Sequence, residues 1–565
     1  MKKFIIICLV AVGVLLIGGG VFAYIYLGNN TTTEEPSSKP SKRVALDDTA
    51  VFYIDLGQML DKSGIDESFT SANRQLAATV LTANLDDRKW NNYAGTLLAN
   101  LAHSGIDIYT PIYGYANFNE EAENIDLVFV GKVIDAAKVD EFVAFCSALI
   151  EEDGAEPIVI DYDGDRRIIE FDDMVVAYNE QRVVLTYTDS DNERRTFLDK
   201  AFKRPVADVS AYAPHDMAIN IRLKPIMNLV RDSVEDNMAM LREEMEYAFY
   251  DEEREYYAEA IASTEDSLEQ FDNMYANLSN DASALLTLTF EDGRIVLEGQ
   301  IDGYKSDFEF GKKLSNDHLA MVGSDALAIL NISVDGKSVG ELLSEQLDPK
   351  YAAMLNMERN EFNIFAGVLC DAIESIDGDV TLAVTDVNVY ETMLSGADIL
   401  LAADVTDDYI ISNIAQYTAG YLQPAGANIY RADFGLNRLL VGQNDDVFYA
   451  ALNMEYTPSA TPVTEAEWFD DVKDSYAYLV LDINNVMDND FIRNAYRQGL
   501  HGANSAEYAI IDSLVDAMGY AYVVVEEKQA AKMVLVFDDK DTNSLEQVVD
   551  IVMPHLIKQM SRNLF

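Results

Sequence analysis

Four segments of the chain share one pattern: a turn containing Asp and Ala, a strand of alternating polarity, and a polar turn that leads into an apolar helix. A pair of alternating strands follows each helix. The four turns carry an aspartate at the same place, namely Asp48, Asp216, Asp325 and Asp474. This recurring order of elements predicts a β-α-β-β unit that is repeated four times.

The segments between the units are also alike. A predicted helix from Ala137 to Ile150 and three strands separate the first two units, and a helix from Tyr409 to Tyr421 with three comparable strands separates the last two. We therefore expect two tandem pseudo-repeat halves, residues 45–305 and 320–565. Long alternating strands with helices packed on one side predict an α+β fold of largely antiparallel sheets.

Residues 1–27 predict a membrane anchor. Lys2 and Lys3 precede 24 residues without a charge, which are enough to cross about 30 Å of hydrocarbon as a transmembrane helix. The two lysines predict a cytoplasmic N-terminus and an extracytoplasmic remainder. Cleavage after Ala23 stays open, but the apolar residues that follow it favour a retained signal anchor. Residues 28–44, rich in Thr, Ser and Pro, are expected to form a flexible linker.

The net charge argues against several classes of partner. The chain has 97 acidic and 41 basic residues, a formal net charge of −56. Such a field repels the phosphates of nucleic acids and anionic lipid headgroups. The three cysteines and five histidines form no recognisable zinc motif, and no glycine-rich dinucleotide fingerprint follows a strand. We therefore expect no nucleic acid, no cofactor and no resident metal.

Residues 336–340, Gly-Lys-Ser-Val-Gly, match the Gly-x-Ser-x-Gly turn that carries the nucleophile of many hydrolases, with Ser338 as the candidate catalytic residue. The stretch also carries Gly-Lys-Ser, the ending of a phosphate loop, but Asn331 stands where that loop needs its first glycine. The other three units have the same turn without such a serine, so a repeat turn is the favoured interpretation. We then expect Ser338 to cap a helix that begins near Val339.

Asp161, Asp163 and Asp165 alternate as in calcium-binding loops and are the candidate metal ligands. Arg166 occupies the sixth position, where such a loop needs glycine for its sharp turn. Because the flanking residues predict strands, a hairpin turn at Asp163-Gly164 is favoured over a calcium site.

Residues 224–280 are an acidic, helix-prone insertion with a partial apolar stripe, made of Met240, Met245, Ala248, Phe249 and Tyr256. Packing within a helical hairpin accounts for this stripe, and a site for a protein partner is the alternative. The matching region of the second half is much shorter. The insertion is therefore the first candidate for a partner site.

The first unit, "ALDDTAVFYIDLGQMLDKSGI", resembles the opening of an uncharacterised family of Bacteroidota cell-envelope proteins, the domain-of-unknown-function family numbered 4836. Its members have an Asp-Leu-x-x-Leu-x-x-Lys-Ser-Gly stretch after the first strand. The corresponding residues here are Asp55, Leu56, Met59, Lys62, Ser63 and Gly64. The resemblance implies a cell-envelope location, and it brings no known activity or catalytic residues.

Together these features predict a membrane-tethered, extracytoplasmic protein that acts by binding or scaffolding, without catalysis. It would cross the cell membrane once, with its bulk facing the periplasm. An envelope hydrolase that acts on a peptide or glycan through an unrecognised active site is the alternative.

Overall fold

The computed structural model describes residues 48–563, apart from 84, 86–87, 120–123, 153–155, 172–173, 189–193, 206–208, 249, 306–310, 347–358, 388, 391–392, 395–396, 418–421, 435–436, 500–504 and 528. The expected anchor (1–27) and linker (28–44) lie outside this part of the chain. Within it, no helix is both long enough and apolar enough to cross a membrane. Antiparallel sheets and helices make up most of it, which confirms the α+β class.

The chain divides into two compact units. The first unit holds the described residues up to Lys305 and those from Lys540 onward, and the second unit holds Ser306–Asp539. The C-terminal helix α17 (Ser544–Asn563) therefore groups with the N-terminal part of the chain. It contacts α2, α3, α4, β10 and β11, and Asp550 accepts a hydrogen bond from the Ser68 hydroxyl. The expected second half, 320–565, differs from the second unit at this end.

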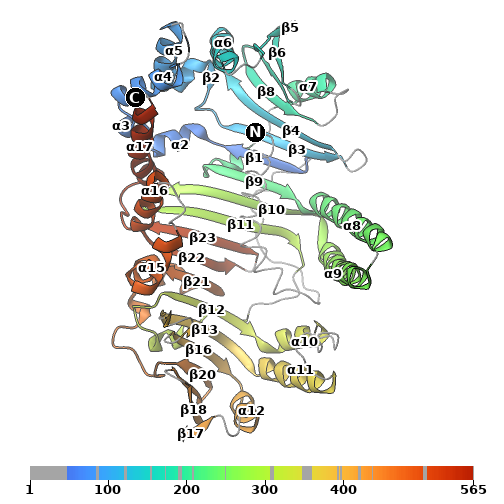
Figure 1. Ribbon diagram of the computed structural model, residues 1–565, viewed down its shortest axis with the longest axis vertical. Helices are drawn as coiled ribbons and strands as arrows, with labels where there is room; N and C mark the ends of the chain where they lie inside the picture. Colours follow the sequence, from blue (N-terminus) through green and yellow to red (C-terminus); the bar gives the residue numbers. More distant parts are fainter. Residues whose placement is uncertain are drawn as a thin grey trace. The chain divides into compact units, whose positions relative to one another are not determined.

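In the first unit, strands that are far apart in sequence form one antiparallel sheet (Figure 1). Its order is β5 (Asp161–Asp163), β6 (Arg166–Phe171), β7 (Met174–Tyr178), β8 (Arg182–Tyr187), β4 (Asn124–Val133), β3 (Ile112–Asn119), β1 (Ala50–Ile54), β9 (Met217–Arg222), β10 (Leu278–Glu291) and β11 (Arg294–Tyr304). The short strand β2 (Ile106–Asp107) pairs with the end of β4. Strand β1 comes first in sequence, and its two neighbours follow much later: α2 to α5 precede β3, and strands β2 to β8 with α6 and α7 precede β9.

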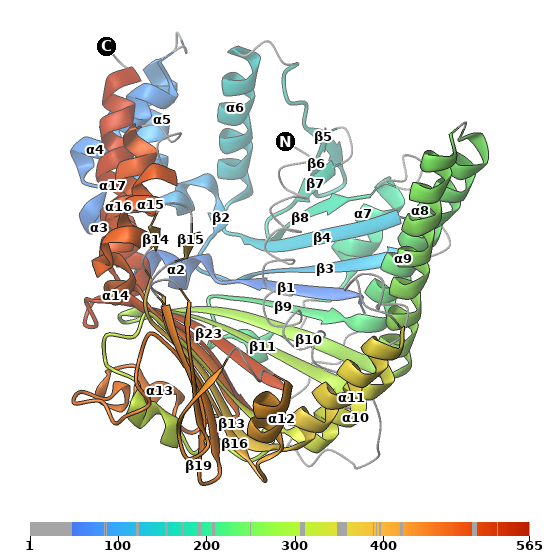
Figure 2. The ribbon, with the colours of Figure 1, turned by 60° about the horizontal axis from the view of Figure 1, so that its bottom comes forward.

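The helices of this unit gather at the two ends of the strands (Figure 2). At one end lie α2 (Leu56–Lys62), α3 (Ile65–Ser68), α4 (Ser71–Leu81), α5 (Arg88–Ala99) and α17. At the other end the hairpin of α8 (Leu223–Tyr247) and α9 (Asp251–Ala276) extends from the strand ends. This hairpin is the helical insertion that the sequence predicts.

Two further helices cover opposite faces of the sheet. Leu198 and Ala201 of α7 (Arg194–Lys203) pack with Ile168, whereas Val139 of α6 (Ala136–Glu152) packs with Ile169. Neighbouring residues of a strand point to opposite faces. The expectation that helices pack on one side of each sheet is therefore wrong here, because these strands are apolar on both faces.

The second unit has its own antiparallel sheet, in the order β17 (Gln423–Gly426), β18 (Ile429–Phe434), β19 (Asn437–Asn444), β20 (Val447–Leu452), β16 (Asp398–Val405), β13 (Ile376–Asp386), β12 (Ala328–Asp335), β21 (Ala477–Asp482), β22 (Met518–Glu527) and β23 (Ala530–Phe537). Its helices are α10 (Gly336–Gln346), α11 (Arg359–Glu374), α12 (Tyr409–Tyr417), α13 (Phe469–Val472), α14 (Ile483–Asp488), α15 (Asp490–Gly499) and α16 (Ser505–Asp516). Strands β14 (Val389–Tyr390) and β15 (Met393–Leu394) form a separate ribbon.

Polar side chains fill part of the buried face of this second sheet. Asn331 is fully buried and donates to Asn316 (3.0 Å), while its amide oxygen accepts from Thr381 (2.9 Å). The hydroxyl of Tyr478 donates to the same Asn316 oxygen (2.9 Å). Buried polar groups linked in this way fix one arrangement of the strands, since each would lose its partner in another register.

His318 extends the buried polar region. It lies on a short 3₁₀ helix, η3 (Asp317–Met321), and only 2% of it is exposed. Its Nε2 is 3.2 Å from the carboxylate of Asp404 and 3.3 Å from the carbonyl oxygen of Asp379. Burial opposes the charged imidazolium, but the hydrogen bond and the negative charge of Asp404 outweigh it and raise the pKa of His318 above its ordinary 6.5. Burial also opposes the charged form of Asp404, and the hydrogen bond from His318 overcomes it and lowers the pKa of that carboxyl.

This pair predicts a pH dependence of stability. Because the folded-state pKa of His318 is raised, the imidazolium stabilises the second unit below pH 6.5, and that contribution is lost as the pH rises through the folded-state value. The free energy of unfolding of the second unit should therefore fall as the pH rises above about 6.5. Urea unfolding followed by circular dichroism at each pH measures this slope. His318→Gln should reduce the slope, and His215→Gln in the first unit should not; an identical slope in His318→Gln would contradict the assignment.

Candidate functional site

Ser338 lies in the first turn of α10, which begins at Gly336 rather than near Val339. The carboxylate of Asp335 accepts hydrogen bonds from the Ser338 amide (3.4 Å) and hydroxyl (3.0 Å). Asp335 is therefore the capping residue, and the expectation that Ser338 caps the helix is wrong. An aspartate directly before the helix is a better acceptor for the free amides of the first turn than a serine within it.

The two glycines of the Gly-x-Ser-x-Gly stretch are explained by helix packing. A Cβ atom on Gly336 would lie 2.0 Å from the carbonyl oxygen of Ile373 and 2.2 Å from that of Ile376. A Cβ atom on Gly340 would lie 2.4 Å from the Glu374 side chain. The first turn of α10 thus sits directly on the backbone at the end of α11, a contact that has no room for a larger residue.

We predict that Gly336→Ala destabilises the second unit by about 1 to 3 kcal/mol, because the added methyl group overlaps backbone carbonyls. Ser338→Ala should cost about 0.5 to 1.5 kcal/mol, the value of one hydrogen bond. Gly367→Ala is the control, since no atom lies within 4 Å of a Cβ placed at that helical position. Urea unfolding gives the three values. Labelling of the native protein by a fluorophosphonate that disappears in Ser338→Ala would instead make Ser338 a nucleophile.

The three candidate metal ligands point to different partners. Asp163 pairs with Arg166 across the β5–β6 hairpin. Asp161 contacts Arg195 (3.2 Å), and Asp165 accepts from Asn179 (3.0 Å). The turn itself is formed by Gly164, with a φ of 64°, and Asp165. Among the residues that the structure describes, no group of three or more His, Cys, Asp or Glu side chains is arranged to hold a metal ion.

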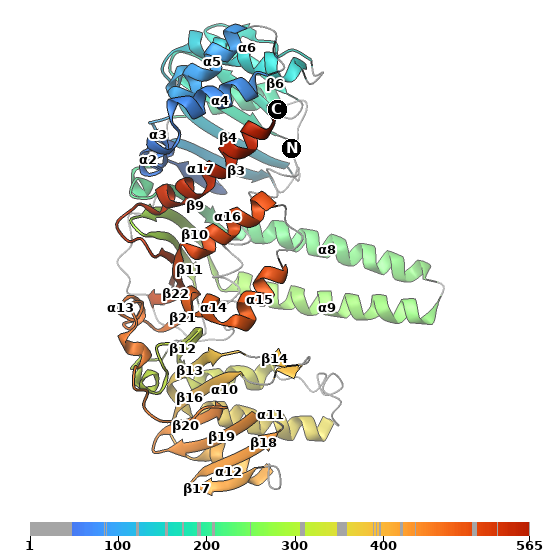
Figure 3. The same cartoon turned by 60° about the vertical axis from the view of Figure 1, so that its left-hand side comes forward.

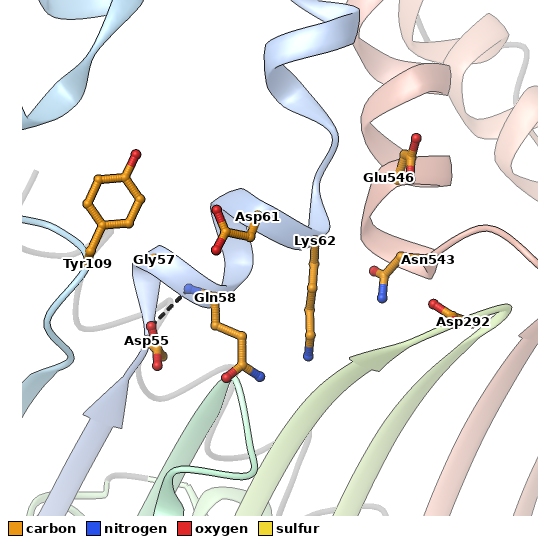
Figure 4. Close-up of a pocket in the computed structure, with 9 residues that line it drawn as sticks. All are labelled: Asp55, Gly57, Gln58, Asp61, Lys62, Tyr109, Asp292, Asn543 and Glu546. Atoms are coloured by element: carbon orange, nitrogen blue, oxygen red, sulfur yellow. Dashed lines mark hydrogen bonds between the residues drawn. The ribbon is translucent and has the colours of Figure 1, made fainter.

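A cavity of about 630 Å³ lies in the first unit, between the start of α2 and the start of α17 (Figure 4). Most of its lining is charged or polar: Asp55, Gln58, Asp61, Lys62, Asp292, Asn543 and Glu546, together with Gly57 and Tyr109. The helices α2 and α17, which both contribute to this lining, come from opposite ends of the described chain. The cavity therefore exists only because α17 returns to the first unit.

Local contacts explain how α2 builds one wall of the cavity. Asp55 caps this helix by accepting from the Gln58 amide (2.9 Å), and it also accepts from the Tyr53 hydroxyl (3.3 Å). Burial and the Asp55 charge together raise the pKa of Tyr53 to about 12. Gly57 lies so close to Tyr109 that a Cβ atom would be 2.8 Å from its Cα. The stretch that resembles the family's opening is thus the wall of a cavity.

Lys62 connects this wall to the sheet. Its Nζ lies 2.6 Å from Oδ2 of Asp216, a carboxylate with no exposed surface. The same oxygen accepts from the Phe290 amide of β10 (2.7 Å).

The other aspartates of the repeated pattern have different environments. Asp48, which precedes β1 as Asp216 precedes β9, is also buried and pairs with Arg204. Asp325 and Asp474 of the second unit are exposed, so the four aspartates of the repeated pattern do not share one environment.

We predict that Lys62→Met destabilises the first unit by about 3 to 5 kcal/mol, because it leaves the Asp216 carboxylate buried without its cation. Lys62→Met combined with Asp216→Leu should recover much of this loss, since the unpaired charge is then gone. Lys132→Met is the matched control: Lys132 pairs with Asp107 at 2.8 Å but is 57% exposed, and its loss should cost less than about 1 kcal/mol. Urea unfolding compares them. Equal costs for the two single variants would refute a buried ion pair.

The helical insertion offers a second candidate surface, at the turn between α8 and α9. A cavity of about 470 Å³ is lined there by Met240, Glu243, Glu244, Tyr247, Ala248, Glu253 and Tyr257. Of the predicted apolar stripe, Ala248 is buried, but Met240 and Tyr256 are 53% and 67% exposed. Phe249 lies outside the described residues. The stripe is therefore only partly used for packing within the hairpin.

Sequence reasoning missed two features of these sites. Lys62 carried no signal of its role, because its partner Asp216 is 154 residues away. Tyr256 was interpreted as a packing residue of the hairpin, and the exposed Tyr247 and Tyr250 were not singled out. An apolar spacing shows which residues share a helix face, and it does not show whether that face is covered.

Comparison with known proteins gives one family and two distant structures. A model of the family described as Domain of unknown function (DUF4836) matches residues 242–545. Crystal forms III and I of TP0453 are similar at 9% and 10% sequence identity; the matches cover 48% of this chain and 83% and 82% of TP0453, with TM-scores of 0.23 and 0.20. Likeness at this level supports no conclusion about function. No curated protein matches the sequence.

Proposed function

The chain belongs to the DUF4836 family, and from this premise we propose that it is a membrane-tethered, extracytoplasmic protein of the bacterial cell envelope that acts by binding or scaffolding a protein partner. The family's description names no reaction and no ligand. The proposal therefore rests on the chain itself. Its tether is supported by the uncharged run that follows Lys2 and Lys3.

The observation that carries the binding function is the exposed end of the α8–α9 hairpin. Two helices of 25 and 26 residues project away from the sheet (Figure 3). At the end farthest from the strands lie large side chains that the hairpin does not cover, namely Met240, Tyr247, Tyr250 and Tyr256. We call these four residues the tip surface. Grouped exposed aromatic residues are typical of protein interaction sites.

We also propose that the two units descend from one duplicated unit. The support is the order of strands: β1, β3, β4, β5 to β8, β9, β10 and β11 take the same places in the first sheet as β12, β13, β16, β17 to β20, β21, β22 and β23 take in the second. In each unit a helical segment follows the corresponding strand, which is β9 in the first unit and β21 in the second. The long hairpin distinguishes the first unit, where α14, α15 and α16 stand in the second.

We predict that the tip surface holds the partner in cells. Chemical crosslinking in intact cells, followed by quantitative mass spectrometry, should recover a partner with the wild-type protein. Tyr247→Ala with Tyr250→Ala should reduce that recovery about tenfold, since aromatic residues dominate the binding energy of many interfaces. Tyr109→Ala, an exposed tyrosine at the cavity near α2, is the control. Equal recovery with the tip variant and with the wild type would contradict the proposal.

The tether has a separate test. N-terminal sequencing of the protein extracted from membranes should find the leader retained. A mature protein that begins at Tyr24 would show cleavage after Ala23 and refute the anchor.

A further inference from the structure

The tip surface exposes three tyrosine side chains and one methionine side chain. Tyr247, Tyr250 and Tyr256 are 71%, 70% and 67% exposed, and Met240 is 53% exposed. They come from the last turns of α8, the connecting turn and the first turns of α9. Tyr247 and Met240 also line the tip cavity, so one exposed ring and one exposed thioether adjoin a hollow that a side chain can enter.

The cavity beside these rings is strongly negative. Glu243, Glu244 and Glu253 are three of its seven lining residues. The negative charge of Glu244, which also accepts a hydrogen bond from Tyr257, raises the pKa of that phenol. The whole hairpin is acidic as well, with 15 acidic and 4 basic residues between 223 and 276.

The nearby cations are already engaged. Arg242 and Arg254 are the only basic residues between positions 240 and 260. Arg242 binds Glu265 of the facing helix (2.7 Å), and the Nε of Arg254 donates to the Ala248 carbonyl oxygen (3.1 Å). Both guanidinium groups thus have acceptors other than the three carboxylates that line the cavity.

These observations restrict the chemistry of an occupant. An anionic partner would be repelled, and a purely apolar one would cover carboxylates without replacing their hydration. A lysine or arginine side chain matches both features, because its apolar stem can lie against Met240 and a tyrosine ring while its charged end meets the carboxylates. The faces of tyrosine rings also attract cations.

We infer that the tip surface and its cavity dock a lysine- or arginine-bearing segment of the partner protein. This inference rests on the proposed function and adds the charge of the partner to it. The rest of the acidic hairpin supplies a longer-range field that brings such a segment to the tip.

The test uses a tetralysine peptide with a neutral fluorescent label, titrated with the full-length protein in detergent micelles and followed by fluorescence anisotropy. Glu243→Gln with Glu244→Gln should raise the dissociation constant about tenfold, and Tyr247→Ala should raise it by a similar factor. The matched control is Asp232→Asn with Asp236→Asn, which removes the same charge from exposed positions of α8 away from the tip cavity. It should change the dissociation constant less than about twofold.

Two results would overturn the inference. An equal loss of affinity in the control would show that the peptide responds only to the general negative field. Sedimentation with phosphatidylethanolamine vesicles that is lost in the Glu243→Gln, Glu244→Gln variant would assign the amine to a lipid. If tetralysine fails while the tip variant still loses its partner in cells, the binding function stands and only the partner's charge is wrong.

Discussion

The ion pair between Lys62 and Asp216 holds together the part of the first unit on which its cavity depends. Asp216 receives the lysine through its side chain, and its backbone is bonded to Asp55 (2.9 Å) and Leu288 (3.0 Å). One residue therefore joins α2, β9 and β10. A carboxylate with no exposed surface is very costly without a cation, so the position of α2 is strongly determined. The position of α2 in turn fixes the cavity wall that this helix forms.

The other wall of the cavity is formed by the start of α17, which groups with the first unit although it lies near the C-terminus. Asn543 donates to the Phe290 carbonyl oxygen (3.2 Å), and Gly293 donates to Thr542 (2.8 Å). These bonds fix the start of α17 at the β10–β11 hairpin. In a chain with a net charge of −56, few cations are available for buried carboxylates. The structure uses Lys62 and Arg204 at the two strand starts of the first unit and leaves the matching carboxylates of the second unit in water.

Local sequence signals predicted the elements well and their packing less well. Alternating strands, the helices after them and the hairpin at 224–280 were all visible, because each depends on residues close in sequence. The family match confirms the resemblance, although the Asp55–Gly64 stretch that carried it precedes the matched residues. The packing of α6 and α7 on opposite faces was missed, because a strand that is apolar on both faces reads as ambiguous. The place of α17 depends on contacts across almost the whole chain. The exposure of Tyr247 depends on what covers a helix face, which residue types alone do not encode.

We propose that this protein acts by binding through the hairpin tip rather than by chemistry in a cavity. The most direct measurement places a photoreactive amino acid at Tyr247 or at Asp61 in intact cells and compares the products. We expect a discrete protein crosslink from position 247 and none from position 61, which lines the cavity near α2. A crosslink from position 61 alone, to a peptide or glycan, would contradict binding through the tip and favour an envelope hydrolase.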